Sequence, residues 1–496
     1  MHVKKYGKQK QNKPRDVFKQ IAARAAAGCL AVYEWVKRRP LLLYSALFVF
    51  GALIAYGIIS RYHFLTQDQL ENLNSVYMGA RQSILNYFFN ALRAGEIMDF
   101  GRMPAQDGMP GYYILLSYLS RILGKPEAWQ MFLIVQSAGG FILLAVYPAL
   151  IYRTSKSLPA ALFSPFLIDI LCGDFIYRVK TDGAWSMAWV IVLGVPLLYI
   201  LLKNEWDKRG WAWFGVLCLV MSLGNVPRVH ASLPIAFLLV VILAYKLVYL
   251  PVKKNKEEKT GDRKKDALKL ALRLLPFAAS IIILFFSYDF LVNGLGKAYT
   301  FATGQKDVIF TTKPWHTAYI GFGFEENKYG ITYSDSCAYS KALETNPNVR
   351  YLSDEYMNIL RNEYFKIMRE DLKYFAGSYY RKFMQNIKMV MSFLPFWRND
   401  IYGDRLLYFI AVYIVLLCAK FKEMTKKYFW LMLGAFSCVF TGMAQAMIAV
   451  PGYRYLLPSF AAGNLVLFYV VIIGIEASTG ALYERLKKYL TNKTGA

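Results

Sequence analysis

The chain has 496 residues, of which 56% are hydrophobic and 16% aromatic, and its mean hydropathy is +0.28. These values are high for a soluble protein and ordinary for a membrane protein with several spans. The net charge of +26 comes from 59 Lys and Arg against 33 Asp and Glu. The cations stand in short segments between apolar runs, without interleaved aromatic residues, so they indicate membrane topology and contact with anionic membrane lipids. The composition argues against a nucleic-acid partner.

The six cysteines, at positions 29, 172, 218, 337, 418 and 438, are scattered, and most fall inside apolar runs. Without a CxxC pair or regular spacing, they indicate neither a disulfide framework nor a zinc site. About forty residues precede the first long apolar run, which predicts an uncleaved anchor rather than a cleavable signal peptide. Within them, apolar residues recur at helical spacing from Phe18 to Val36, which predicts an amphipathic helix on the inner leaflet.

Apolar runs of about twenty residues are long enough to cross a bilayer. Ten candidates begin near Leu41, Ala128, Leu158, Ala184, Trp211, Leu233, Leu275, Leu406, Phe429 and Phe460. An even number of spans places both termini on one side. The basic connections fall on that side, at residues 1–39, 153–156, 203–209, 253–273, 420–427 and in the tail, and the positive-inside rule makes it cytoplasmic. We therefore expect an all-α, polytopic transmembrane helix bundle of about ten spans.

Four parts follow from this topology. They are a cytoplasmic tail with the amphipathic helix (1–40), an N-terminal transmembrane module (41–293), an extracytoplasmic segment (294–404), and C-terminal transmembrane helices with a cytoplasmic tail (405–496). The first outer loop, about 60–110, carries an expected interfacial helix at 70–92 and then a turn-rich stretch. Shorter outer connections are expected at 173–183, 224–232 and 451–459. The segment 294–404 should become helical after Ser353, an N-cap followed by two acids. Its amphipathic continuation to Phe396 should contact the membrane surface.

Soluble-enzyme motifs are absent from the sequence, which has no Walker loop, GxSxG, HExxH or GxGxxG after a strand. Any chemistry must then come from isolated acids and bases at the outer ends of the spans. Asp68 and Glu71 follow the first span directly. A carboxylate at this depth can act as a general base on an acceptor hydroxyl, or it can be a solvated loop acid that caps the next helix. Asp107 stands in the turn before Tyr112, where it either holds an acceptor hydroxyl or forms the turn.

Several cations also stand on the outer side, where the positive-inside bias disfavours them. They are Arg178 and Lys180 (with Asp182 nearby), Arg228 (with His230 nearby), and Arg454. Arg can bind a lipid phosphate through two donors, although anchoring to headgroups explains the same positions. Asp169 and Asp289 lie in or near apolar spans, where pairing with a neighbouring span is the simpler role.

Histidine and tryptophan complete the candidates. The outer histidines, His63, His230 and His316, lack the alternating spacing with acids that a metal site would favour, so a divalent metal is left open and none is assigned. Trp315 and His316 either line an acceptor groove or pack in the core of the outer segment.

The order of these features resembles the GT-C superfamily of integral-membrane glycosyltransferases, nearest to the bacterial relatives of protein O-mannosyltransferases and aminoarabinose transferases. The resemblance rests on the first span and the acids at its outer end, the interfacial helix, the turn in residues 106–113, and Arg454 in Gly452-Tyr-Arg-Tyr-Leu-Leu-Pro458. It covers roughly the first 240 residues and the last 50. The turn lacks the His and one Pro that are common in the family, which leaves the sugar and acceptor open.

The resemblance implies an inverting hexosyl- or pentosyltransferase that uses a polyprenyl-phosphate-linked sugar. The acceptor would be a glycan, lipid or protein on the extracytoplasmic face of a bacterial inner (plasma) membrane. Asp68 would be the general base, supported by Glu71, and the cations above would hold the phosphate. Two alternatives stay open: a transporter or flippase of lipid-linked glycans, and a polymerase of such glycans. The sequence shows neither the internal symmetry nor the paired broken spans of many transporters.

Overall fold

The computed structural model describes residues 38–63, 128–176, 185–204, 207–225, 231–249, 314–351, 353–392 and 421–494, with isolated positions between them. All regular elements in these ranges are helices. Five of their helical stretches are long and apolar enough to cross a membrane: Pro40–Ser60, Ile134–Ser155, Ser186–Lys203, Tyr428–Ile448 and Tyr455–Arg485. They correspond to the spans predicted near Leu41, Ala128, Ala184, Phe429 and Phe460. The all-helical class is therefore confirmed for the described residues, and five of their helices are candidate membrane spans.

The other five predicted spans are either shorter or less apolar than these, or lie mostly outside the described residues. Helix α6 (Leu158–Ile176) and helix α9 (Leu233–Leu243), which continues as the π-helix η2 (Ala244–Tyr249), contain shorter apolar stretches. Helix α8 (Lys208–Asn225) begins with two cations and is not among the five long apolar stretches. The spans predicted near Leu275 and Leu406 lie almost entirely outside the described residues. A total of about ten spans thus stays a prediction.

Helix α7 (Trp185–Lys203) is the centre of the bundle, in contact with α5 (Ala128–Ser155), α6, α8, α9, α17 (Phe421–Ile448) and α18 (Tyr453–Thr494). Its span is 89% buried, against 28% for the span in α2 (Pro40–His63). Almost every position of α7 is apolar, so it presents a hydrophobic surface in all directions, as a helix surrounded by other helices requires. Helix α2 packs on α5 and α6 at the edge of the bundle.

Two predicted cytoplasmic connections are tight turns. Between α5 and α6, Lys156 adopts a positive φ of 59°, and only Lys156 and Ser157 separate the two helices. Between α7 and α8, the Asp207 carboxylate accepts hydrogen bonds from the backbone N–H groups of Arg209 and Gly210 at 3.0 and 2.9 Å. Asp207 thereby satisfies donors that the first turn of a helix leaves free.

Helix α18 begins earlier than predicted. The sequence predicts a connection at 451–459 and a span from Phe460, but α18 already begins at Tyr453 and includes Pro458. The preceding helix, α17, ends at Ile448, so the connection contains only residues 449–452. Close packing explains the early start, because a Cβ added to Gly442 of α17 would lie 2.7 Å from the Ser459 Oγ. With 42 residues, α18 is about 63 Å long, which is roughly twice the hydrocarbon core of a bilayer.

Residues 314–392 form a separate unit, the α12–α15 domain. It contains α12 (Pro314–Ile320), the 3-10 helix η3 (Gly321–Phe324), α13 (Asp335–Thr345), α14 (Asp354–Glu370) and α15 (Leu372–Ser392). Its own hydrophobic cluster is centred on Phe322, Tyr356 and Leu360, none of which is exposed. The predicted N-cap is confirmed, because the Ser353 hydroxyl accepts a hydrogen bond from the Tyr356 backbone N–H.

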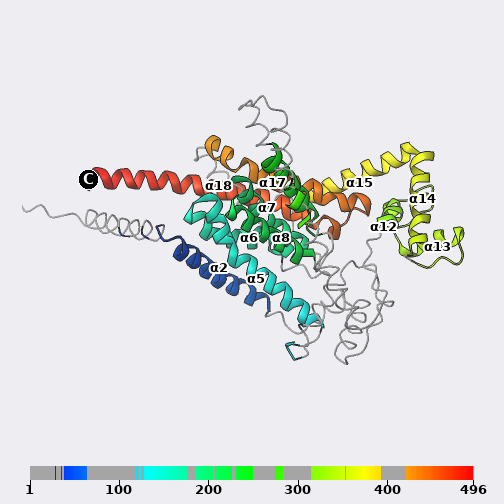
Figure 1. Ribbon diagram of the computed structural model, residues 1–496, viewed down its shortest axis with the longest axis horizontal. Helices are drawn as coiled ribbons and strands as arrows, with labels where there is room; N and C mark the ends of the chain where they lie inside the picture. Colours follow the sequence, from blue (N-terminus) through cyan, green and yellow to red (C-terminus); the bar gives the residue numbers. More distant parts are fainter. Residues whose placement is uncertain are drawn as a thin grey trace, which may run out of the picture.

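The amphipathic stretch after Ser353 contains a break. Asp371 leaves helical geometry (φ −144°, ψ 69°), and its carboxylate accepts from the Tyr374 N–H at the start of α15. Lys328 and Tyr329 also bond to the Asp371 carboxylate. These contacts let the chain turn between α14 and α15 (Figure 1), so that α14 stays in the domain and α15 reaches the bundle.

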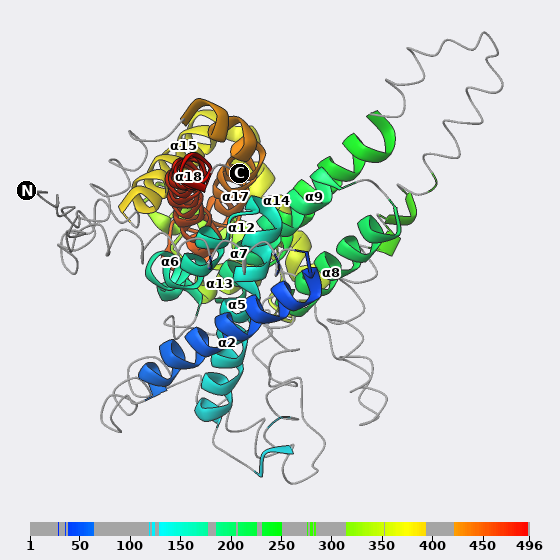
Figure 2. The same cartoon turned by 90° about the vertical axis from the view of Figure 1, so that its left-hand side faces the viewer.

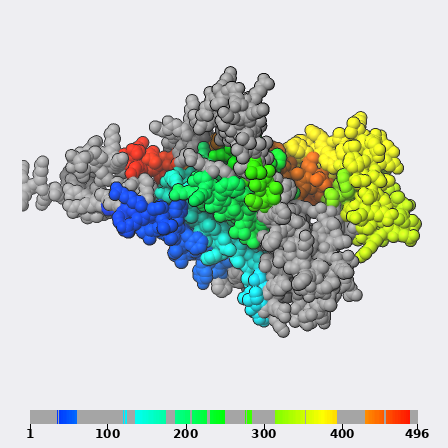
Figure 3. Space-filling model, in the orientation of Figure 1, coloured from blue at the N-terminus to red at the C-terminus, as the bar shows by residue number. Residues whose placement is uncertain are grey.

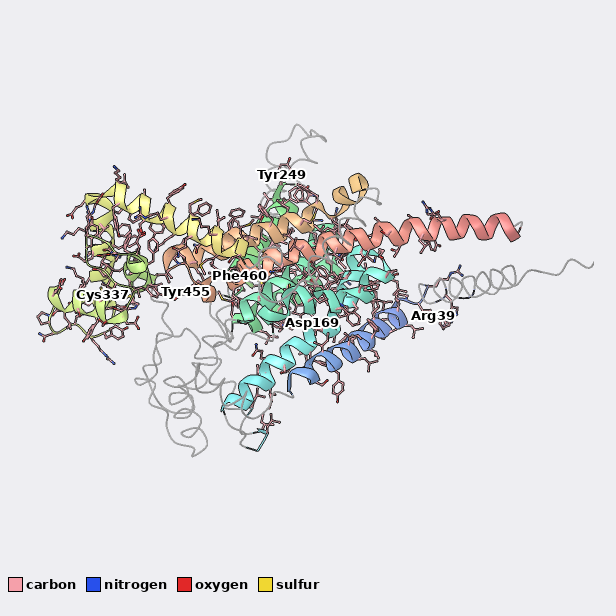
Figure 4. All side chains as sticks on the ribbon, turned by 180° about the vertical axis from the view of Figure 1, so that it is seen from behind. Arg39, Asp169, Tyr249, Cys337, Tyr455 and Phe460 are labelled. Atoms are coloured by element: carbon pink, nitrogen blue, oxygen red, sulfur yellow. The ribbon has the colours of Figure 1, made fainter. Side chains whose placement is uncertain are left out.

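The domain lies at one end of the bundle (Figure 1), and the space-filling view shows it as a projecting lobe beside α17 (Figure 3). The start of α2 and the end of α18 lie at the opposite end, as Arg39 in Figure 4 illustrates. Seen from the α18 end, α15, α17 and α18 group together, while α8 and α9 lie on another flank (Figure 2). The predicted topology likewise expects the start of α2 and the end of α18 on one side of the membrane and the segment 294–404 on the other.

Candidate functional site

The bundle contains an apolar groove of about 860 Å³, lined by residues of α2, α5, α7 and α8 together with Leu119. Along α5 its lining runs from Ile134 to Arg153, a rise of about 28 Å that matches the hydrocarbon thickness of a bilayer. Ile142 and Leu219 in its walls are 53% and 56% exposed, so the groove is open to its surroundings. Its size and composition suit a hydrocarbon chain.

Arg153 is the one charged residue among the described residues that line this groove. Its guanidinium donates to the Asn204 side-chain oxygen at 3.5 Å, and Lys246 donates to the Asn204 backbone carbonyl at 2.8 Å. Both cations therefore lie near the Arg153 end of the groove, which the predicted topology places on the cytoplasmic side.

A second candidate region lies where the α12–α15 domain meets the turn between α17 and α18. Lys382 of α15 is fully buried there. Its Nζ donates to the backbone carbonyls of Ala449, Met447 and Ile448 at 2.9, 3.2 and 3.5 Å. The last carbonyls of a helix have no partner within it, so Lys382 satisfies the C-terminal end of α17.

Three aromatic rings form the other side of the Lys382 site. Its Nζ lies 5.1, 5.4 and 5.7 Å from the ring centres of Tyr379, Phe324 and Phe322. Burial lowers the pKa of Lys382 from 10.5 to about 7, and the Glu325 carboxylate opposes this shift. Cation–π contacts and the helix terminus also favour the charged form. Burial thus favours the neutral form of the Lys382 amine, whereas the carbonyl acceptors around it favour the charged form.

The same junction brings the domain close to the Arg454 motif. A Cβ added to Gly321 would lie 2.3 Å from the Ile448 carbonyl oxygen, so only a glycine allows η3 to approach the turn. The Tyr333 and Tyr455 hydroxyls are hydrogen-bonded at 2.8 Å, and Figure 4 shows Tyr455 at the boundary between bundle and domain. Arg454 therefore lies in the first turn of α18, and the domain contacts this turn through Tyr455.

The α12–α15 domain has a polar cleft of its own, about 460 Å³, between facing sides of α13 and α14. Lys341 on one side forms ion pairs with Glu344 at 3.0 Å and with Glu363 on the other side at 4.0 Å. Tyr319 and Tyr329 also line it. Hydroxyl, carboxylate and ammonium groups around a cleft of this size suit a small polar ligand such as a sugar unit.

Trp315 and His316 lie in this domain but not in the lining of its cleft. His316 is 5% exposed, and its ring nitrogens bond to the Tyr356 hydroxyl at 2.6 Å and the Asp335 carboxylate at 2.9 Å. Trp315 packs against Tyr364 and Phe365. These contacts favour core packing over an acceptor groove for both residues.

Most of the predicted site residues are not placed. Those outside the described residues are Asp68, Glu71, Asp107, Tyr112, Arg178, Lys180, Asp182, Arg228, His230 and Asp289. The backbones of His63 and Arg454 lie in α2 and α18, but their side chains are outside the described part. Asp169 lies within α6 and has an interaction partner, while its predicted pairing with a neighbouring span stays a prediction.

The sequence reasoning missed Lys382 altogether. On an amphipathic helix a lysine normally lies on the solvated side, and nothing in the local sequence marks this one as buried. The buried residues of α15 recur at every fourth position, at Ser378, Lys382, Asn386 and Val390. A buried helix side is normally recognised by apolar residues at this spacing, but three of these four residues are polar.

In the described ranges, no group of three or more His, Cys, Asp and Glu side chains could hold a metal ion. No protein-family model, curated protein or solved structure matches the chain.

Proposed function

We propose that this chain is a membrane glycosyltransferase of the GT-C type. It would move a hexosyl or pentosyl group from a polyprenyl-phosphate donor to a glycan, lipid or protein acceptor on the extracytoplasmic face. The observation that supports the proposal best is the open apolar groove, which is long enough for a hydrocarbon chain and lies in a bundle with a polar domain at one end. A lipid-linked sugar has the same two parts, a long apolar chain and a polar head.

In this proposal the groove and the cleft bind different substrates. The groove holds the lipid chain of the donor, and the cleft between α13 and α14 holds part of the acceptor. Arg454, with one or more of Arg178, Lys180 and Arg228, binds the donor phosphate and stabilises its departing charge. Asp68 takes the proton from the acceptor hydroxyl as the new glycosidic bond forms and the sugar–phosphate bond breaks.

The mechanism is tested with purified protein in liposomes, supplied with a panel of polyprenyl-phosphate hexoses and pentoses and with membrane-derived acceptors. Asp68→Asn should lower sugar transfer by about 10²–10⁴-fold, the usual loss for a positioned general base. Donor binding should survive this substitution. In Arg454→Ala, donor binding should weaken by about tenfold or more, because a hydrogen-bonded charge pair is lost.

Matched controls are available in the α12–α15 domain. Asp354 and Arg361 are exposed on α14, so Asp354→Asn and Arg361→Ala should leave both transfer and donor binding unchanged. Near-wild-type transfer by a folded Asp68→Asn variant would overturn its role. Movement of the lipid-linked sugar across the bilayer without transfer would instead identify a transporter.

The face of the membrane is tested through Cys337, which is partly exposed, whereas Cys172, Cys218 and Cys438 are buried. In intact cells with Cys29 and Cys418 replaced by alanine, a membrane-impermeant maleimide should label Cys337 before lysis. Protection of Cys337 until the cells are lysed would place the domain in the cytoplasm and would contradict an extracytoplasmic reaction.

A further inference from the structure

The buried ammonium group of Lys382 is an unusual way to join a water-exposed domain to a membrane bundle. Lys382 has no exposed surface, and no carboxylate of the part of the chain that the structure describes is in direct contact with it. If the domain separated from the α17–α18 turn, the Lys382 amine and the carbonyls of residues 447–449 would all meet water. Docking therefore transfers this one amine from water into the protein.

The number of donors on the amine fits either protonation state. An ammonium has three N–H donors, one for each of the three carbonyls. A neutral amine has two, which are enough for the two shorter contacts, to Ala449 at 2.9 Å and Met447 at 3.2 Å. The third contact, to Ile448, is the longest at 3.5 Å. Loss of a proton thus leaves the two better hydrogen bonds in place and removes the cost of burying a charge.

We propose that docking of the α12–α15 domain onto the α17–α18 turn is linked to the loss of a proton from Lys382, so that pH controls how firmly the turn before Arg454 is held. The proton passes to the solvent when the domain docks and returns to the amine when it separates. Lys382 acts here as a positioning residue, since it touches the turn and not a reacting group.

The direction of the effect follows from the two states of the amine. Separated and in water, Lys382 has its ordinary pKa of 10.5, whereas burial lowers the pKa of the docked amine to about 7. Between these values the separated state binds more protons than the docked state, so docking becomes stronger as pH rises. Below about pH 7 both states are protonated, and docking should be weakest and independent of pH.

The other ionisable groups around Lys382 are already engaged. After η3, Glu325 forms an ion pair with Arg381 of α15, with a shortest N···O distance of 2.5 Å. The Tyr379 hydroxyl is bonded to Tyr364 at 2.7 Å, and burial raises the pKa of Tyr379 above its ordinary value of 10.0. From α17, the residues that contact the amine offer backbone carbonyls.

On the α18 side, the Tyr455 hydroxyl is bonded to Tyr333, and the Arg454 side chain is outside the described part. The described groups around Lys382 are thus held in hydrogen bonds or ion pairs, and Lys382 is the one whose pKa burial lowers to about 7.

The proposal is tested by hydrogen–deuterium exchange of the full-length protein in lipid nanodiscs from pH 6 to 9. The readout is the protection of backbone amides in residues 318–324 and 447–456, after correction for the intrinsic pH dependence of exchange. In the wild type, protection should rise by up to about tenfold per pH unit above about pH 7, which is the slope for one proton.

Three variants separate a proton-linked junction from a fixed one. Lys382→Met cannot be protonated and Lys382→Arg cannot lose its charge, so both should abolish the pH slope. Lys388→Met removes an exposed lysine two turns further along α15 and should keep it. The wild-type slope can be measured even if a Lys382 variant does not fold.

A flat wild-type profile, or a slope that survives in Lys382→Met, would overturn the proposal. A flat profile with protection lost in Lys382→Met and kept in Lys382→Arg would identify a permanently charged cap on α17 instead. None of these measurements uses sugar transfer, so this proposal and the proposed glycosyltransferase can fail independently.

Discussion

In the transmembrane bundle the buried residues are mainly Leu, Ile, Val and Ala, whereas many partly buried aromatic rings pack around the core of the α12–α15 domain. Phe322 alone lies within 6.3 Å, centre to centre, of four other rings, those of Tyr364, Tyr374, Phe375 and Tyr379. The domain also carries polar contacts between side chains, including His316 to Asp335 and Arg381 to Glu325. In the bundle, Gly51 of α2 lets its helix lie close to the backbone of α5 at Leu144 and Ala145.

This difference follows from the surroundings of the two regions. Lipid is as apolar as the helices, so burial of apolar side chains gives spans little reason to associate, and close packing at small residues matters more. A small domain in water must bury a large apolar area with few residues, and aromatic rings supply the largest area for each residue. The two regions should therefore respond differently to similar substitutions.

The largest effect is expected from Phe322→Ala in the α12–α15 domain. Phe322 is fully buried among rings, and removal of such a side chain usually costs about 3–5 kcal/mol. We expect the domain to become sensitive to protease at a lower temperature while the bundle stays intact. Tyr380→Ala, at a ring that is 64% exposed, is the matched control. Simultaneous loss of domain and bundle would show that they do not fold as separate units.

An intermediate effect is expected from Gly51→Ala in the bundle. Its Cβ would lie 2.6 Å from the Ala145 carbonyl oxygen of α5, and this backbone atom cannot move aside easily. Overpacking of this kind costs about 1–3 kcal/mol, which a detergent-unfolding titration can measure. Gly57 on the same helix has no atom near the position of an added Cβ, so Gly57→Ala should not destabilise the protein. Equal responses of the two variants would argue against close α2–α5 packing.

The smallest effect is expected from Tyr333→Phe, which removes one hydroxyl of the Tyr333–Tyr455 pair. A hydrogen bond of this type contributes about 1 kcal/mol, so global stability should hardly change. Exchange of the amides in the first turn of α18 should become a few times faster. The same change in Tyr380→Phe, at a site exposed to solvent, would mean that the Tyr333–Tyr455 contact does not hold this turn.

Features encoded by neighbouring residues could be read from the sequence alone. Leu41, Ala128, Leu158 and Leu233 were predicted as starts of apolar helices, and the helices begin at or within one residue of them. Ser353 was recognised as an N-cap for the same reason, since its partner is the backbone N–H three residues later. Apolar run length and capping depend on neighbouring residues, so contacts with distant parts of the chain do not change them.

Tertiary contacts decided the rest. The turn at Asp371 depends on Lys328 and Tyr329, and the early start of α18 depends on packing against Gly442 of α17. The burial of Lys382 depends on carbonyls more than sixty residues away. A lysine within an amphipathic helix normally indicates a solvated side, and only the approach of α17 makes this one a buried donor. The sequence by itself thus determined a helical membrane protein with a separate aromatic segment, while the meeting of that segment with α17 and α18 was decided by partners distant in the chain.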